Sequence, residues 1–294
     1  DPTKVATIGT ATGGNMALWL GVIAHQADPT ATDYRKESSR PDAAVLDNGA
    51  SDWTALGQNM YPIAPLSYYT VTDISQWPGV PLADKQWASP DWQAVQMPQK
   101  GYNWMVPTLT VYLDVNPPTA PIDNFHDSGF GLLHTAVMKG IGNVWTKSVY
   151  FAMQAKSATP IEAFQVAAPF IDLAFHATPY GDGGGAGGTL GISPHLALIA
   201  LGANGQVKVG NLPPGATVTL FAGTQQLSQP IPGGTLLVSP DYVVGTKPPG
   251  PKGDAMFNFD FGLAGGQDVF FQAVVTDPGT AAGYILSSAL KVEP

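Results

Sequence analysis

The sequence predicts an all-β protein made of two β-sandwich domains, of the jelly-roll or immunoglobulin-like kind, with long Pro/Trp-rich loops. Gly (34) and Pro (27) are abundant and only 12% of the 294 residues are charged, a composition typical of β proteins with many turns. Aromatic residues make up 10% of the chain, which argues against disorder. Short segments with an apolar period of two recur along the chain, and no helical period extends beyond two turns. These observations together favour paired antiparallel strands.

The end of the chain carries the clearest strand pattern. Residues 268–276 and 284–292 are extended apolar segments, and Asp277-Pro278-Gly279 between them has turn chemistry. We predict a β-hairpin here, forming the closing edge of the C-terminal sandwich.

The C-terminal domain is predicted to span residues 195–294. Phe257, Phe259 and Phe261 alternate with Asn258 and Asp260, so one face of that strand is buried and the other is wet. Short strands with turns between them indicate an immunoglobulin-like sandwich. The predicted strands are residues 195–201, 206–209, 217–222, 235–239, 255–261, 269–275 and 284–292.

The N-terminal domain is predicted to span residues 1–180, and the glycine-rich residues 181–194 form a hinge. Its irregular part, residues 25–102, is interrupted by many X-Pro pairs that break strands. The predicted strands of this second sandwich are residues 4–8, 16–24, 67–72, 103–115, 130–138, 144–155 and 165–176.

The first strand, residues 3–10, is short, rich in β-branched residues and followed by Gly13-Gly14. One interpretation is a hairpin within the chain's own sheet. The other is a donor strand that completes the sheet of a neighbouring subunit, as in β-strand addition. The polymerisation strand would then consist of Lys4, Val5, Ala6, Thr7 and Ile8.

Five tryptophans lie in or just after the irregular region. Two interpretations remain open: they pin the loops to the sandwich, or they form a subunit interface or a glycan-stacking platform, since Trp is favoured at both. These residues are Trp53, Trp77, Trp87, Trp92 and Trp104.

Composition excludes several classes of function. The net charge is −9 without a block of Lys or Arg, which argues against nucleic-acid binding. No apolar run approaches the ~20 residues of a membrane helix, so no membrane span is predicted. The chain has no Cys, which excludes disulfides, thiolate metal sites and a Cys nucleophile.

Motifs for catalysis are absent from the sequence. There is no Gly-x-Ser-x-Gly elbow, and His126 and His134 lack the spacing of a helical zinc site. The loop 114–127 offers the carboxylates of Asp114, Asp123 and Asp127, oxygen ligands that suit a structural calcium ion. No other cofactor is predicted.

A resemblance covers about the last third of the chain. It rests on LPPGATVTLFAG (212–223), IPGGTLLVSPD (231–241) and FFQAVVTDPGTAAGYILSSALKV (270–292). These segments resemble a C-terminal module of large secreted proteins from planctomycete-type bacteria. The resemblance implies a secreted β-sandwich accessory module without known catalytic residues. A start at Asp1 is compatible with signal-peptide removal, so an extracellular or cell-surface location is expected.

These inferences predict a structural protein that is not an enzyme. It would be a subunit of an extracellular fibril or surface layer that polymerises with itself by N-terminal strand donation, with polysaccharide or O-linked glycan as a further partner. The alternatives are a carbohydrate-binding surface protein, a viral jelly-roll capsid protein, and a glycosidase or other hydrolase.

Overall fold

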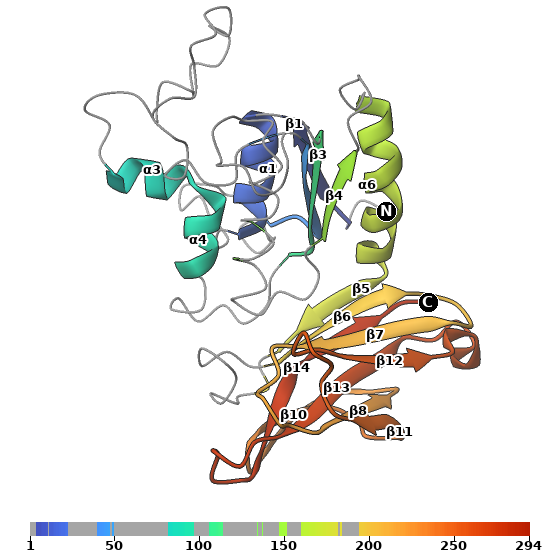
Figure 1. Cartoon of the computed structure of the whole chain (residues 1–294). Coiled ribbons are helices and arrows are strands. Elements are labelled where there is room, and N and C mark those ends of the chain that lie inside the picture. The colour runs from blue at the N-terminus through green and yellow to red at the C-terminus, as the bar shows by residue number, and fades with distance from the viewer. Residues whose placement is uncertain are drawn as a thin grey trace, which may run out of the picture. The chain divides into compact units, whose positions relative to one another are not determined.

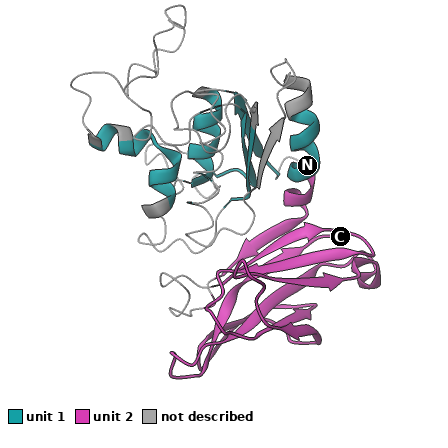
Figure 2. Ribbon diagram, in the orientation of Figure 1, with its two compact units in different colours: residues 1–100, 106–138, 146–171 teal, residues 101–105, 139–145, 172–294 magenta. Residues whose placement is uncertain are grey.

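The chain divides into two compact units, shown in different colours in Figure 2. Unit 1 comprises residues 1–100, 106–138 and 146–171, and unit 2 comprises residues 101–105, 139–145 and 172–294. The computed structural model describes residues 4–10, 12–22, 40–47, 49, 82–96, 106–113, 134, 137, 147–151, 160–181, 183 and 194–294.

Unit 1 is built on a parallel sheet. Its strands are β1 (Ala6–Thr10), β2 (Ala43–Asp47), β3 (Thr108–Leu113) and β4 (Lys147–Phe151), and they pair in that order, all parallel. Every residue of β2 is buried. Parallel strands require crossover connections and are normally covered on both faces, which explains why β2 is apolar along its length rather than alternating.

Helix α1 (Thr12–Val22) covers one face of this sheet. Its Gly14 and Gly21 approach the side chains of Leu46 and Ala44 so closely that an added Cβ would lie 2.5 Å and 3.0 Å from them. Ala44 and Leu46 lie on the same face of β2 because side chains alternate along a strand.

Helix α6 (Pro160–Phe175) covers the opposite face, and Figure 1 shows the two helices on either side of the sheet. Its Ala167 packs in a buried cluster with Val45, Leu109 and Val111. Val45 alternates with Ala44 and Leu46, so the two helices enclose the sheet as a three-layer α/β/α arrangement. Two short helices, α3 (Leu82–Ala88) and α4 (Pro90–Gln96), complete the described part of unit 1.

The prediction of an N-terminal β-sandwich is wrong. Residues 16–24 and 165–176 were predicted as strands but lie largely in α1 and α6, and His134, within the predicted strand 130–138, is helical. Both helices are apolar around much of their circumference, so they lack the polar stripe that marks a helical period. Pro169 inside α6 further weakened its helical pattern. The coarser prediction of a β-rich chain is confirmed, since fourteen strands are present among the described elements.

The described part of unit 2 forms three antiparallel sheets. The five-stranded sheet has the order β11-β8-β13-β14-β5, the three-stranded sheet β12-β7-β6, and β10 pairs with β9. The strands are β5 (Ala177–Tyr180), β6 (His195–Ala200), β7 (Gly205–Gly210), β8 (Val218–Gly223), β9 (Gln226–Ile231), β10 (Gly234–Val238), β11 (Tyr242–Lys247), β12 (Ala255–Phe259), β13 (Val269–Thr276) and β14 (Tyr284–Val292), with a 3-10 helix η3 (Phe261–Ala264).

An aromatic cluster joins the two larger sheets. The ring of Phe271 on β13 lies 5.0 Å from that of Phe259 on β12 and 5.9 Å from that of Phe261 in η3, each edge to face. Phe271 is fully buried. The five-stranded and three-stranded sheets therefore pack face to face over these rings.

All seven strands predicted for residues 195–294 are present. The unpredicted strands include β9 and β11, which are largely exposed and carry little apolar alternation. The predicted hairpin is β13 with β14, but β14 lies between β13 and β5 and is not the edge of its sheet. Most of the predicted hinge, residues 184–193, lies outside the described residues.

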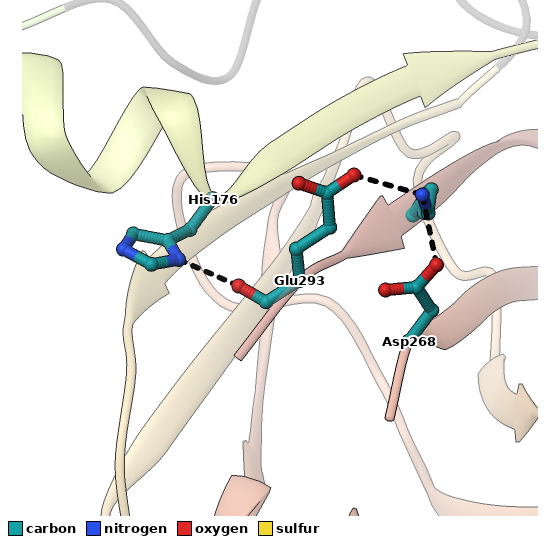
Figure 3. Close-up of polar contacts among 4 residues, drawn as sticks. His176, Asp268 and Glu293 are labelled. Atoms are coloured by element: carbon teal, nitrogen blue, oxygen red, sulfur yellow. Dashed lines mark hydrogen bonds and ion pairs between the residues drawn. The ribbon is translucent and has the colours of Figure 1, made fainter. Parts of the chain in front are cut away.

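Polar contacts fasten the end of β14, as Figure 3 shows. Lys291 Nζ lies 2.8 Å from Asp268 Oδ2 and 2.8 Å from Glu293 Oε1. The hydrogen bond with Asp268, followed by that with Glu293, raises the pKa of Lys291. His176 Nδ1 donates to the Glu293 carbonyl at 2.5 Å, and the Glu293 N–H donates to the His176 carbonyl at 2.8 Å. The end of β14 is thus tied to the start of β5 and to the start of β13.

The raised pKa of Lys291 predicts a loss of stability at high pH. A raised pKa in the folded state stabilises the fold below the unfolded pKa of about 10.4, and this contribution disappears as pH rises through the folded value. Lys291→Met should therefore cost about 0.5–1 kcal/mol of unfolding free energy at pH 8 and less at pH 11.5, as measured by urea unfolding. Lys252→Met, at an exposed turn, is the control. An equal cost of Lys291→Met at both pH values would contradict the prediction.

Candidate functional site

A sharp turn joins the first strand of unit 1 to its first helix. β1 ends at Thr10 and α1 begins at Thr12, so Ala11 is the single residue between them. An added Cβ on Gly9 would lie 2.2 Å from the Gly13 carbonyl oxygen, and one on Gly14 would lie 2.5 Å from the Gly9 carbonyl oxygen. Backbone approaches backbone here at distances that only glycine allows. We call this strand-turn-helix, residues 9–14, the elbow.

The elbow lies at the carboxyl edge of the parallel sheet. In open α/β sheets, ligands bind at this edge. Thr10 is in register with Asp47, the last residue of β2. The exposed Thr10 donates a hydrogen bond from Oγ1 to Asp47 Oδ2 at 3.0 Å, and Asp47 is only 4% exposed. The N-terminus of α1 begins at the same edge, and helix N-termini offer N–H donors to oxygen anions.

The elbow has the sequence Gly9-Thr10-Ala11-Thr12-Gly13. A Gly-x-Ser-x-Gly sequence on a strand-to-helix turn exposes a nucleophilic serine in hydrolases. The central residue here is Ala11, whose methyl group cannot attack a carbonyl. The arrangement can hold an acyl oxygen at the helix N-terminus, but it supplies no nucleophilic side chain at that position.

Sequence reasoning missed the elbow because it searched for the serine. The signal that remains in the sequence is the glycine spacing, Gly9 with Gly13-Gly14, directly after a β-branched segment. That signal has meaning only when the following residues form a helix, and they were predicted as a strand.

A second polar cluster links a hydroxyl, an imidazole and a carboxylate in the order of a catalytic triad. His134 Nδ1 lies 2.5 Å from Asp91 Oδ1, and His134 Nε2 lies 3.2 Å from Thr108 Oγ1. The side chains of His134 and Thr108 are 0% exposed and Asp91 is 1% exposed.

This buried triad holds the fold together rather than acting on a substrate. Thr108 is the first residue of β3 and pairs with Ala44, whereas Asp47 at the elbow pairs with Val111. Three residues of strand separate these positions by roughly 10 Å, so the cluster lies toward the amino edge of the sheet. Full burial keeps substrate away from all of its members. It ties helical His134 to α4 and β3.

The predicted polymerisation strand belongs to the chain's own sheet. Residues 6–10 pair in parallel register with residues 43–47. Before this strand, Val5 N donates to Asp42 Oδ2 at 2.7 Å, and Asp42 N donates to the Val5 carbonyl at 2.6 Å. A strand held on one side by β2 and covered by α1 is not available for donation. The segment concerned is Lys4, Val5, Ala6, Thr7 and Ile8.

Two of the predicted tryptophans are described. Trp87 in α3 is 61% exposed, and its ring lies 5.0 Å from that of Trp19, edge to face. Trp19 Nε1 also donates to the Trp87 carbonyl at 3.0 Å. Trp92 in α4 is partly buried. The interface or glycan-stacking role stays a prediction, and Trp53, Trp77 and Trp104 lie outside the described residues.

The calcium prediction also stays untested, because Asp114, Asp123 and Asp127 lie outside the described residues. Within the part of the chain that the structure describes, no three His, Asp or Glu side chains gather as metal ligands. No helix in the same part is long and apolar enough to span a membrane.

Comparison with known proteins gives only distant likenesses. No protein-family model matches the sequence, and no curated protein matches it. The solved structures that resemble it include an acetyl ester-xyloside bifunctional hydrolase from Caldicellulosiruptor lactoaceticus, 15% identical over 60% of this chain and 58% of that one, with a TM-score of 0.41. A truncated carbohydrate esterase from gut microbiota is 14% identical over 59% of this chain and 61% of that one, with a TM-score of 0.37.

An esterase from the Planctomycetes species Thermogutta terrifontis is 15% identical over 58% of this chain and 57% of that one, with a TM-score of 0.35. The matches thus span about three fifths of the length of these structures. At this identity and score the likeness assigns neither an activity nor a substrate to this chain.

The prediction of a non-enzymatic fibril or surface-layer subunit is contradicted. The solved structures that resemble the chain are hydrolases and esterases. The strand on which polymerisation depended is an internal partner of β2. The prediction was wrong because the sequence contains no Gly-x-Ser-x-Gly elbow. The absence of this motif was interpreted as the absence of enzymatic activity.

Proposed function

We propose that unit 1 is a hydrolase-type α/β unit that holds the acyl group of an ester-like compound at the elbow. The observation that carries this proposal is the glycine-packed turn between β1 and α1 at the carboxyl edge of the sheet. Such a turn aims the first N–H groups of α1 at the position where a carbonyl oxygen becomes negatively charged during hydrolysis.

Water is the nucleophile in this proposal, because Ala11 offers none. The water oxygen bonds to the acyl carbon, the ester C–O bond breaks, and a carboxylic acid and an alcohol leave. The carboxylate of Asp47, held by Thr10 at 3.0 Å, is the candidate acceptor for the water proton and returns this proton to the leaving alkoxide. Oxyanion stabilisation and binding without a triad leave a rate about 10³–10⁴-fold above that in water, so a slow esterase is expected.

Ala11→Cys tests the acyl site directly. The chain has no Cys, so the new thiol is unique, and a thiol at a helix N-terminus has a lowered pKa and needs no neighbouring base. With p-nitrophenyl acetate we expect a burst of p-nitrophenol close to one equivalent, followed by slow turnover. Iodoacetamide alkylation against pH should give a thiol pKa below the ordinary value of about 8.5.

Met16→Cys is the matched control, because Met16 lies on α1 and is 62% exposed. We expect its acylation to be about 100-fold slower, since it lies away from the helix N-terminus and from any oxyanion site. Equal acylation rates in the two variants would overturn the proposal. Fast alkylation of Ala11→Cys without faster acylation would show a helix N-terminus that holds no acyl group, and would overturn it as well.

We further infer that unit 2 is an immunoglobulin-like β-sandwich accessory module of an extracellular protein. The face-to-face packing of its sheets and the strands present in the segments 212–223, 231–241 and 270–292 support this inference. The resemblance of those segments to a module of secreted proteins is its other support.

A further inference from the structure

A cavity of about 300 Å³ opens at one end of unit 2, between the two larger sheets. It lies where β8, β11, β12, β13 and η3 come together, and its walls are mainly apolar. Its volume is at the lower end of the range for small-molecule sites. The residues that matter for its chemistry are Asp241, Tyr242, Phe259, Leu263, Gln267 and Asp268.

Large apolar side chains stand exposed around this cavity. Tyr242 is 60% exposed and Leu263 is 82% exposed. The rings of Tyr242 and Phe259 meet edge to face with centroids 6.5 Å apart. A ligand in the cavity would remove this apolar surface from water, and the aromatic faces attract cations.

One carboxylate at the cavity is fixed in place. Asp241 Oδ2 accepts hydrogen bonds from Thr224 N at 3.0 Å, Thr224 Oγ1 at 3.1 Å and Ser239 Oγ at 2.8 Å. The Thr224 N–H, followed by the Ser239 hydroxyl, lowers the pKa of this carboxyl, so it is charged at neutral pH. All three bonds end on Oδ2, and none of them engages Oδ1.

The second carboxylate is already balanced by a cation. Asp268 Oδ2 lies 2.8 Å from Lys291 Nζ. The described residues that line the cavity include no Lys, Arg or His. No basic residue of the lining therefore offsets the charge of Asp241. This charge lies at the same cavity as the aromatic rings of Tyr242 and Phe259.

We propose that this cavity binds an organic cation, an ammonium group carried on a short apolar chain. The ammonium lies between Asp241 and the face of Tyr242, and the apolar part packs against Phe259 and Leu263. An anionic ligand is disfavoured by the charge of Asp241, and a neutral apolar ligand gains no attraction from it. The proposal is independent of the chemistry of unit 1.

Choline and its neutral isostere 3,3-dimethylbutan-1-ol test this proposal. We titrate the full chain with each probe and measure binding by isothermal titration calorimetry and by ligand-observed NMR. Choline should bind about tenfold more tightly than the isostere. Equal affinity of the two probes would overturn the proposal. So would the absence of choline binding at concentrations up to about 30 mM.

Two variants locate the site. Asp241→Asn keeps an acceptor for Thr224 and Ser239 but removes the charge, and should weaken choline binding about tenfold. Tyr242→Ala should weaken it about fivefold. Asp277→Asn is the control, because it removes the same charge from a turn in which Asp277 Oδ1 accepts from Gly279 N at 2.9 Å. Equal weakening by Asp277→Asn and Asp241→Asn would indicate general charge attraction and overturn the site.

Discussion

Replacing Gly9 by Ala is expected to unfold unit 1. An added Cβ would lie 2.2 Å from the carbonyl oxygen and 2.3 Å from the carbonyl carbon of Gly13. Both atoms belong to the backbone of α1, so they cannot move without separating the helix from β1. Relief would come only by opening the elbow and lifting α1 from Ala44 and Leu46. We expect the free energy of unfolding of unit 1 to fall by about 4 kcal/mol or more, as large as the effects of severe backbone conflicts and core cavities.

Gly13→Ala is the matched control for this experiment. Among the described residues nothing lies within 4 Å of a Cβ at Gly13, and Gly13 is a helical residue of α1. Alanine there should stabilise the helix by about 0.5–1 kcal/mol. Thermal unfolding followed by circular dichroism at 222 nm compares the two variants. A Gly9→Ala protein that melts together with the wild type would show that the elbow is not packed as described.

Unit 2 could be predicted from its sequence because its strands have one wet face. In β12 the buried Ala255 and Phe257 alternate with the exposed Met256 and Asn258, and that period of two is visible without any tertiary information. β9 escaped prediction because its residues are mostly exposed and are held by pairing with β10. A strand whose stability comes from its neighbour leaves little trace in its own sequence.

Unit 1 could not be predicted in the same way because burial on both faces removes the pattern. The five residues of β2 are all buried, and α1 is apolar over most of its length. A short apolar run is compatible with a strand or a buried helix, and only length and context separate them. The residues between β1 and β2 were divided into loop and strand, so the crossover that makes the sheet parallel was lost.

The candidate sites show the same division. The elbow left a glycine spacing in the sequence, and its meaning depended on the helix that follows. The cavity of unit 2 left no such signal in the sequence, because its lining comes from separate segments that only the fold brings together. These segments contribute Thr224, Asp241, Leu263 and Asp268. Sequence spacing finds sites built within one turn, and it misses sites built between sheets.

Replacing Gln272 by Leu is expected to cost about 3–5 kcal/mol of the unfolding free energy of unit 2. Gln272 on β13 is 2% exposed. Its Oε1 accepts from Leu237 N at 2.8 Å, and its Nε2 donates to the carbonyls of Thr235 at 2.9 Å and Ser287 at 3.0 Å. One amide therefore joins β10 to β13 and β14. Leucine has a similar volume but removes the partner of the Leu237 N–H and of the Thr235 and Ser287 carbonyls, and a buried backbone group left unsatisfied costs about 1–3 kcal/mol.

Two further variants separate the lost hydrogen bonds from a general effect of substitution. Gln229→Leu, on an exposed position of β9, should change the unfolding free energy by less than about 0.5 kcal/mol. Gln272→Glu keeps an acceptor for Leu237 N but turns a second oxygen toward two carbonyls, where an ionised carboxylate is repelled and a protonated one can donate. Urea unfolding should therefore find this variant closer to the wild type at pH 4.5 than at pH 8, since the fold raises the pKa of the new carboxyl. A Gln272→Leu protein within 1 kcal/mol of the wild type would show that β10 is held by packing of Leu237 and Val238 rather than by this amide.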